Sequence, residues 1–282
     1  MYANLNTGAI GVRADLEQQV HLAAKYGFKG CDIDLAAAER FGIPQTVELF
    51  AANNLRMGGF GLPVEYRKDE ATFKSGIREL PRWAGIAEEL GCHRCTTWVL
   101  PGSDENSFDE QFRLLRGRFR DCALIFRDHG IRLGLEFIGP KTLRDQFKHE
   151  FIYTLGGMLE LAEAIGTGNV GLLLDAWHWY TSGGDTEQLR RLTNDHIVYV
   201  HINDAPAGID RDQQVDNVRA LPMETGVIDL PEFLRALDDI DYDGPVTTEP
   251  FCAELSKLHA DDAVTLVKQS MVRGWDAADV AW

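Results

Sequence analysis

Short apolar, β-rich runs alternate with longer segments of helical periodicity from one end of the chain to the other. The runs predicted to be strands are Tyr2–Ile10, Gly30–Leu35, Leu55–Phe60, Arg94–Leu100, Ile131–Ile138, Val170–Asp175, Ile197–Ile202 and Pro245–Phe251. Parallel strands need a crossover connection, which is usually a helix and almost always right-handed. Eight strand–helix pairs in 282 residues therefore predict an α/β fold, a single-domain (β/α)8 TIM barrel.

The segments between these runs carry helix signals. Apolar residues three and four positions apart predict one buried helix face at Phe112, Leu115, Phe119, Ala123 and Phe126. Asp229, followed by Leu-Pro-Glu232, is typical of the start of a helix, because its side chain can accept the first free backbone N–H groups.

No linker rich in Pro, Gly or Ser divides the chain, and charge is spread along its length. We therefore expect residues 1–282 to form one barrel domain. Its two longest irregular stretches, Gly61–Asp69 and Asn203–Gly226, follow the third and seventh predicted strands. In a barrel both lie over the carboxyl ends of the strands, which is the face where these folds place their active sites.

The charge balance narrows the class of partner. The chain has 28 basic and 44 acidic residues, a net charge of −16, and its densest basic stretch, Arg113–Arg120, has the spacing of a solvated helix face. Nucleic acid is therefore not an expected partner. No apolar run approaches the ~18 residues of a membrane span, and the start of the chain lacks the pattern of a signal peptide. Five cysteines, an odd number, favour reduced thiols and a cytoplasmic protein.

Four predicted strands carry a polar residue after several apolar ones, at the carboxyl end of the strand. These residues are Glu136, Asp175, His201 and Glu249. Any one of them alone could cap a helix or pair with an arginine. Together, three carboxylates and one imidazole at a partly dry barrel mouth carry a formal charge of −3, which requires a cation. Oxygen-rich ligand sets suit Mn²⁺, Mg²⁺ or Co²⁺ better than a thiolate-type zinc site does.

Two residues near these strand ends have open interpretations. Trp177 could line a sugar pocket with its apolar face or fill the top of the barrel core. Asp204 could support His201, contact a ligand hydroxyl or cap a loop.

The residues resemble those of the xylose isomerase-like barrels, in particular the sugar phosphate isomerase/epimerase group. The matching motifs are Gly134-Leu-Glu136-Phe, Leu174-Asp175-Ala-Trp-His178, Val200-His201-Ile-Asn-Asp204, Gly226-Val-Ile-Asp229-Leu and Thr248-Glu249-Pro. The stretch from His201 to Leu230 is most similar to the inosose isomerase branch, and ketose 3-epimerases belong to the same group.

The resemblance implies a role for each matching position. It makes Glu136, Asp175, His201 and Glu249 the ligands of one divalent metal, with Mn²⁺ first and Mg²⁺, Co²⁺ or Zn²⁺ as alternatives. Glu136 and Glu249 are also the implied acid/base pair. His178 would contact the substrate, a polyol or keto-sugar, and Arg211 would hold an oxygen at its far end. Family members often pair through the barrel face, so a homo-oligomer is one expectation.

The chain departs from the family pattern at three places. Pro222-Met-Glu-Thr-Gly226 stands where Pro-Gly-Glu-Gly is usual. Thr142 occupies the position of a second glutamate, and Ala207 that of an arginine, in the ketose epimerases. These differences disfavour a simple free-ketose epimerase.

The expected reaction is proton transfer next to a carbonyl, through a metal-stabilised enediolate, in carbohydrate metabolism. Reprotonation on the opposite face gives an epimerase, and reprotonation on the neighbouring carbon gives an isomerase. Loss of a β-hydroxyl would instead give a dehydratase or lyase of the inosose or 3-keto-sugar type. A non-catalytic sugar-binding barrel and a zinc-dependent endonuclease are more remote alternatives.

Overall fold

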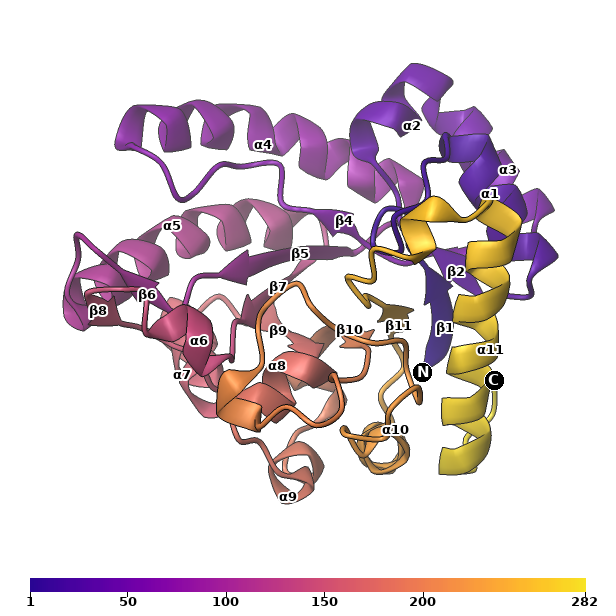
Figure 1. The fold of residues 1–282 in the computed structure, drawn as a ribbon. Helices are drawn as coiled ribbons and strands as arrows, with labels where there is room; N and C mark the ends of the chain where they lie inside the picture. The colour runs from indigo at the N-terminus through magenta and orange to yellow at the C-terminus, as the bar shows by residue number, and fades with distance from the viewer.

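The computed structural model describes all of residues 1–282 and confirms the predicted barrel (Figure 1). The strands are β1 Tyr2–Leu5, β2 Gly30–Cys31, β3 Arg56–Met57, β4 Phe60–Gly61, β5 Arg94–Val99, β6 Gly102–Ser103, β7 Arg132–Phe137, β8 His149–Glu150, β9 Val170–Asp175, β10 Ile197–Ile202 and β11 Pro245–Thr248. The α-helices are α1 Leu16–Lys25, α2 Leu35–Phe41, α3 Ile43–Ala52, α4 Glu70–Leu90, α5 Phe108–Asp128, α6 Lys141–Arg144, α7 Leu155–Ile165, α8 Ala176–Thr181, α9 Thr186–Arg190, α10 Leu230–Asp239 and α11 Ala260–Ala278. Short 3₁₀ helices are η1 Asn194–His196, η2 Arg211–Gln213 and η3 Leu255–Lys257.

The main sheet is parallel and closes on itself. Its order is β3-β2-β1-β11-β10-β9-β7-β5-β4, and its two outer members, β3 and β4, are separated in sequence only by Gly58 and Gly59. Gly58 N–H donates to the Cys31 carbonyl and Ile33 N–H to the Gly59 carbonyl, so the ladder to β2 continues through the two glycines. β3 and β4 are thus one barrel position, and the sheet has eight positions.

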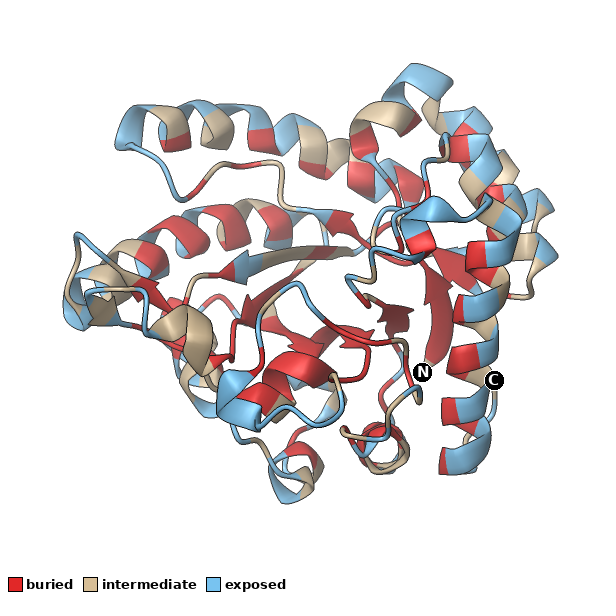
Figure 2. Ribbon diagram, viewed as in Figure 1, coloured by how far each residue is buried: buried red, intermediate tan, exposed pale blue.

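The inner strands are buried and the outer faces of the helices are exposed (Figure 2). Every residue of β10 is buried, as are the last five of β9. The predicted stripe on α5 packs into the core through Leu115, Phe119, Ala123 and Phe126. Asp229 caps α10 as predicted, by accepting from Glu232 N–H at 3.1 Å. No helix of the chain is both long and apolar enough to cross a membrane.

Two strands match their predicted bounds, the predicted strand Leu55–Phe60 is divided into β3 and β4, and the others are shorter. β9 and β10 span the predicted residues. The first strand ends at Leu5 because Asn6 starts a turn, in which its Oδ1 accepts from Ala9 N–H. The second ends at Cys31 because Asp34 caps α2 through Ala37 N–H at 2.7 Å. Polar residues at these strand ends therefore stop pairing and start the next element.

Gly58 is a close-approach position at the barrel closure. A Cβ on this residue would lie 2.5 Å from Asp32 Oδ1 and nearer still to Asn4 Oδ1, whereas a Cβ on Gly61 would have no neighbour within 4 Å. We expect Gly58→Ala to lower the free energy of unfolding by about 1–3 kcal/mol through overpacking, with Gly61→Ala as the matched control. Thermal unfolding measures the difference, and equal melting temperatures for the two variants would contradict this account of the closure.

Candidate metal centre

Four side chains from neighbouring strands meet at one end of the barrel. Glu136 lies near the end of β7, Asp175 ends β9, His201 is the penultimate residue of β10, and Glu249 follows β11 directly. Cross-strand register places His201 beside Asp175. One ligand atom from each of the four residues lies within 4.8 Å of those of the other three. The structure thus brings together all four predicted ligands.

His201 is the centre of the cluster. Its Nδ1 atom lies 3.4 Å from Glu136 Oε1, 3.3 Å from Glu249 Oε2 and 3.8 Å from Asp175 Oδ2. Asp175 has no exposed surface, and Glu136 and His201 are also buried. Three carboxylates in such a place have lost most of their hydration and depend on nearby positive charge.

The donor atoms of the cluster fit a divalent cation. Glu136 Oε1 and His201 Nδ1 are buried and have no hydrogen-bond partner. Buried polar atoms almost always have a partner, so two unpaired atoms that face each other point to a missing ligand between them. Three carboxylate oxygens and one imidazole nitrogen are a set that Mn²⁺, Co²⁺ or Zn²⁺ accepts.

The pKa shifts follow from the same crowding. Burial raises the pKa of Glu136 to about 7, and the neighbouring Glu249 carboxylate adds to the rise. Burial opposes the charged form of His201, yet the Glu249 and Glu136 carboxylates hold its pKa well above the usual value. Burial also acts to raise the pKa of Glu249, but His201 and Arg219 together hold it below its usual value. Protons on Glu136 and His201 therefore offset charge where no cation is bound.

Arg219 lies at the cluster, although its sequence pattern had assigned it no role. Its guanidinium is buried, and Nη1 lies 2.8 Å from Asp175 Oδ2 and 3.2 Å from Glu249 Oε2. The rings of Trp177 and Phe251 lie 4.9 and 4.6 Å from its central carbon. The available signals were its place in the loop 203–226, which the barrel fold puts over the strand ends, and the resemblance of the stretch 201–230 to inosose isomerases. The three carboxylates carry a formal charge of −3, and Arg219 brings the sum to −2. One divalent ion neutralises this remainder.

The structure gives His178 and Trp177 places behind the cluster. The Nδ1 atom of His178 lies 3.2 Å from the Gly139 backbone nitrogen, and its Nε2 lies 3.0 Å from Arg219 Nη2. Burial, together with the Arg219 charge, lowers the pKa of His178 to about 3, so the ring is neutral. Trp177 is fully buried and packs against Arg219 and His178. Of its two interpretations, this position matches the one in which it fills the top of the barrel core.

The other two predicted substrate contacts, Asp204 and Arg211, lie in the loop 203–226. Asp204 is buried and accepts from the backbone N–H groups of Thr225, Gly226 and Ile228, so it organises the loop 203–226. Arg211 is exposed on η2, where its nearest charged partner is Asp212 at 3.9 Å. Of the three interpretations of Asp204, loop capping is the one that its contacts match.

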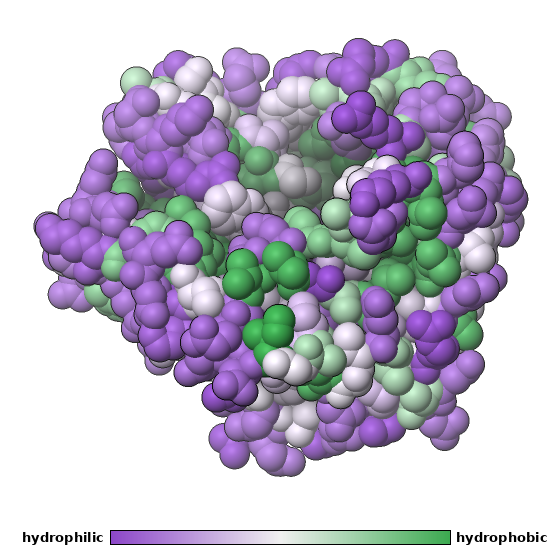
Figure 3. All heavy atoms as spheres, viewed as in Figure 1, coloured by the Kyte–Doolittle hydropathy of each residue, from purple (hydrophilic) through white to green (hydrophobic).

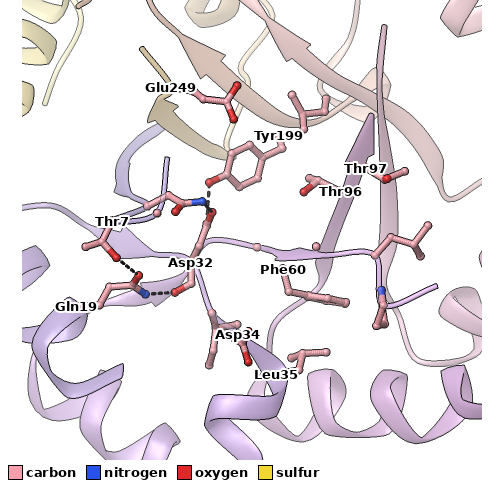
Figure 4. A pocket seen from close by; sticks show the side chains of 18 of the residues that line it. Thr7, Gln19, Asp32, Asp34, Leu35, Phe60, Thr96, Thr97, Tyr199 and Glu249 are labelled. Atoms are coloured by element: carbon pink, nitrogen blue, oxygen red, sulfur yellow. Dashed lines mark hydrogen bonds between the residues drawn. The ribbon is translucent and has the colours of Figure 1, made fainter. Parts of the chain in front are cut away.

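A cleft of about 1210 Å³ opens beside the cluster. Glu136, His201 and Glu249 line it from one half of the barrel, and residues that follow β1, β2 and β4 line it from the other. None of His178, Trp177, Asp204 and Arg211 lies in this lining. Figure 3 shows the molecule hollowed, with both hydrophilic and hydrophobic residues around the opening. Figure 4 shows Glu249, Tyr199 and Asp32 facing into the same pocket.

Comparison with known proteins assigns this barrel to a family. The family profile described as xylose isomerase-like TIM barrel matches residues 20–271. The chain belongs to this family. A relative in the family, the inosose isomerase of Bacillus velezensis, is 29% identical over 267 residues, which cover 91% of each chain.

Two solved structures show the same barrel. The xylose isomerase domain protein of Alicyclobacillus acidocaldarius has a TM-score of 0.89 and 30% identity over 99% of both chains. The IOLI protein, whose crystal structure contains a zinc atom, has a TM-score of 0.82 and 21% identity over 99% of this chain and 98% of its own. The second likeness concerns the fold alone.

Arg219 and Arg211 offer a matched test of the charge balance. Arg219→Met leaves the buried Asp175 carboxylate and the half-buried Glu249 carboxylate without their counter-charge, so we expect the metal-free protein to lose about 3–5 kcal/mol of stability. Arg211→Met removes an exposed arginine and should change stability by less than about 0.5 kcal/mol. Thermal unfolding without and with Mn²⁺ measures both, and the ion should raise the melting temperature more in Arg219→Met than in wild type. Equal losses in the two metal-free variants would contradict the role given to Arg219.

Proposed function

We propose that this xylose isomerase-like barrel is a divalent-metal-dependent isomerase or epimerase of a sugar, keto-sugar or keto-inositol. The observation that carries the proposal is the cluster of three carboxylates and His201, of which Glu136, Glu249 and His201 line a cleft large enough for a sugar. The inosose isomerase relative supports the class of enzyme and substrate. The fold alone would leave the chemistry open, because barrels of this type support many reactions.

Glu136, Asp175, His201 and Glu249 would hold the ion. A divalent ion there would polarise a substrate carbonyl and so acidify the neighbouring C–H bond. The IOLI protein, which shares this barrel, binds a zinc atom in its crystal structure, and this supports a divalent ion in the present barrel. We propose Mn²⁺ as the resident ion, because three of the four ligands are carboxylates.

Glu136 and Glu249 are the proposed acid/base pair. Both line the cleft and approach His201 Nδ1 with one oxygen, at 3.4 and 3.3 Å. One glutamate removes the proton next to the substrate carbonyl, and the other returns a proton to the resulting enediolate. Return to the opposite face of the same carbon inverts it, and return to the neighbouring carbon moves the carbonyl.

Arg219 positions Glu249, and His178 contacts Arg219 on the side away from the cleft. Arg219 holds the Glu249 carboxylate at 3.2 Å, and His178 and Trp177 hold the Arg219 guanidinium. Direct contact of His178, Trp177, Asp204 or Arg211 with the substrate stays a prediction.

The proposal includes the setting of the enzyme. All five cysteines are free, and all but Cys252 are buried, in keeping with reduced thiols of the cytoplasm. We propose a cytoplasmic enzyme of carbohydrate metabolism whose residues 1–282 form one barrel domain.

Glu249→Gln tests the acid/base assignment. The amide keeps the size of the side chain and one oxygen for the ion but cannot take up a proton, so we expect hydrogen–deuterium exchange at the reacting carbon to fall by at least about 100-fold. The measurement is NMR of a ketose or a keto-inositol incubated in D₂O with the Mn²⁺-loaded enzyme. Glu254→Gln, an exposed position five residues further along the same loop, is the control.

Full exchange by Glu249→Gln would contradict the assignment. Loss of water from the substrate in the same experiment would instead identify a dehydratase, the alternative that the same proton abstraction allows. His201→Asn should lower the metal content, whereas Glu249→Gln should retain most of it.

A further inference from the structure

The cleft has a second polar wall that the proposed chemistry does not use. The candidate ligands come from β7, β9, β10 and β11, whereas Asn6, Asp32 and Asp34 line the cleft from the ends of β1 and β2. We call these three residues the far wall. An inference about their role rests on the proposed function, because it concerns the part of the substrate remote from the reacting carbon.

We propose that Asp32 determines substrate specificity, by accepting a hydroxyl of an uncharged polyhydroxylated substrate and by excluding substrates that carry a phosphate at that end. Asp32 is half-buried and faces the cleft (Figure 4). A carboxylate offers about four acceptor positions on its two oxygens. Asp32 Oδ1 accepts from Asn4 Nδ2 at 2.9 Å and from the Tyr199 hydroxyl at 2.7 Å, while Oδ2 accepts only from Asn6 Nδ2 at 2.9 Å. Oδ2 therefore retains capacity for a further donor.

The carboxylate is held rigidly in place. Gln19 donates to the Asp32 carbonyl and accepts from the Thr7 hydroxyl at 2.7 Å. Gly58 leaves no room for a Cβ beside Asp32 Oδ1. An acceptor fixed on both sides loses little freedom when a hydroxyl binds, which is the condition for a selective contact.

A substrate at the metal centre would reach this acceptor. The Tyr199 ring packs edge-on against the His201 ring with centroids 5.4 Å apart, and its hydroxyl bonds Asp32. One tyrosine side chain thus spans the gap from the candidate metal ligand to the far wall. A molecule the size of a hexose or cyclitol spans a similar gap within the cleft.

The charge of the far wall opposes a phosphate. Asp32 and Asp34 both place carboxylates on it, and Asp34 is exposed apart from its bond to Ala37 N–H. Of the two arginines that line the cleft, Arg67 is bound to Glu65 through Nε at 2.8 Å and Nη2 at 2.9 Å. Arg13 is exposed and also lines the neighbouring groove with Lys25 and Asp261. Neither arginine bonds to the far wall.

Four probes with an α-hydroxyketone group test the proposal on the full-length, Mn²⁺-loaded protein. Dihydroxyacetone lacks the remote hydroxyls, D-fructose and 2-keto-myo-inositol have them, and D-fructose 6-phosphate adds the phosphate. Calorimetry should show D-fructose or 2-keto-myo-inositol binding tenfold or more tightly than both dihydroxyacetone and the phosphate ester. Failure of both D-fructose and 2-keto-myo-inositol to exceed dihydroxyacetone would overturn the proposal.

Asp32→Asn should remove at least fivefold of that advantage and narrow the discrimination against the phosphate ester. It should leave the affinity for dihydroxyacetone and the Mn²⁺ content within twofold of wild type. Asp34→Asn, which preserves a capping side chain for α2, is the matched control and should keep the advantage over dihydroxyacetone within twofold. If Asp32→Asn weakens all probes equally and loses Mn²⁺, Asp32 serves only to hold Tyr199 and His201, and the proposal fails.

Asp32→Glu covers the possibility that the asparagine variant does not fold. It keeps the charge and extends the carboxylate into the cleft, so it should weaken the larger probes and spare dihydroxyacetone. Binding is measured here without turnover. Absence of deuterium exchange with this selectivity intact would therefore overturn the proposed function alone, and exchange without selectivity would overturn the role of Asp32 alone.

Discussion

Three carboxylates packed around one imidazole, two of them buried, are the constraint on which the rest of this site depends. Glu136, Asp175 and Glu249 approach His201 within 3.8 Å at a place with almost no solvent. Such a group is stable only if positive charge is built in beside it. Arg219 supplies one charge, and the remaining −2 matches a divalent ion. The raised pKa values of Glu136 and His201 follow from the same excess of negative charge, because it favours bound protons on both residues.

One half of the barrel carries the charged cluster, and the other half carries a separate polar network. β7, β9, β10 and β11 bring the four side chains to one point, and the loop 203–226 folds Arg219 over them. The other half closes through Gly58 and Gly59 and carries a polar network around Asp32. Tyr199 joins the two halves, with its ring on His201 and its hydroxyl on Asp32. Packing at the closure and the shape of the substrate cleft are thus linked through a few contacts.

The barrel and the four clustered residues could be predicted from the sequence, because both follow from local patterns. β9 and β10 are continuous apolar runs that end in Asp175 and His201, and parallel strands bring such ends together. Arg219 could not be predicted in the same way. The ketose epimerase pattern places an arginine six residues after the ligand histidine, and this position is Ala207 here. An arginine instead returns to the site through a long loop. Asp204 fixes the path of that loop by accepting from the N–H groups of Thr225, Gly226 and Ile228. The family resemblance at Arg211 and the place of Asp204 after a strand end indicate a substrate contact, whereas loop geometry decides where both side chains lie.

The metal content of the purified protein tests the central claim most directly. Elemental mass spectrometry after loading with Mn²⁺ and dialysis should find one divalent ion per chain in the wild type. It should find none in a Glu136→Gln/Glu249→Gln double variant, whose remaining charge no longer requires a cation. A wild-type protein that binds no divalent ion, with its fold intact, would show that Arg219 and protons alone balance the three carboxylates. That result would contradict the account.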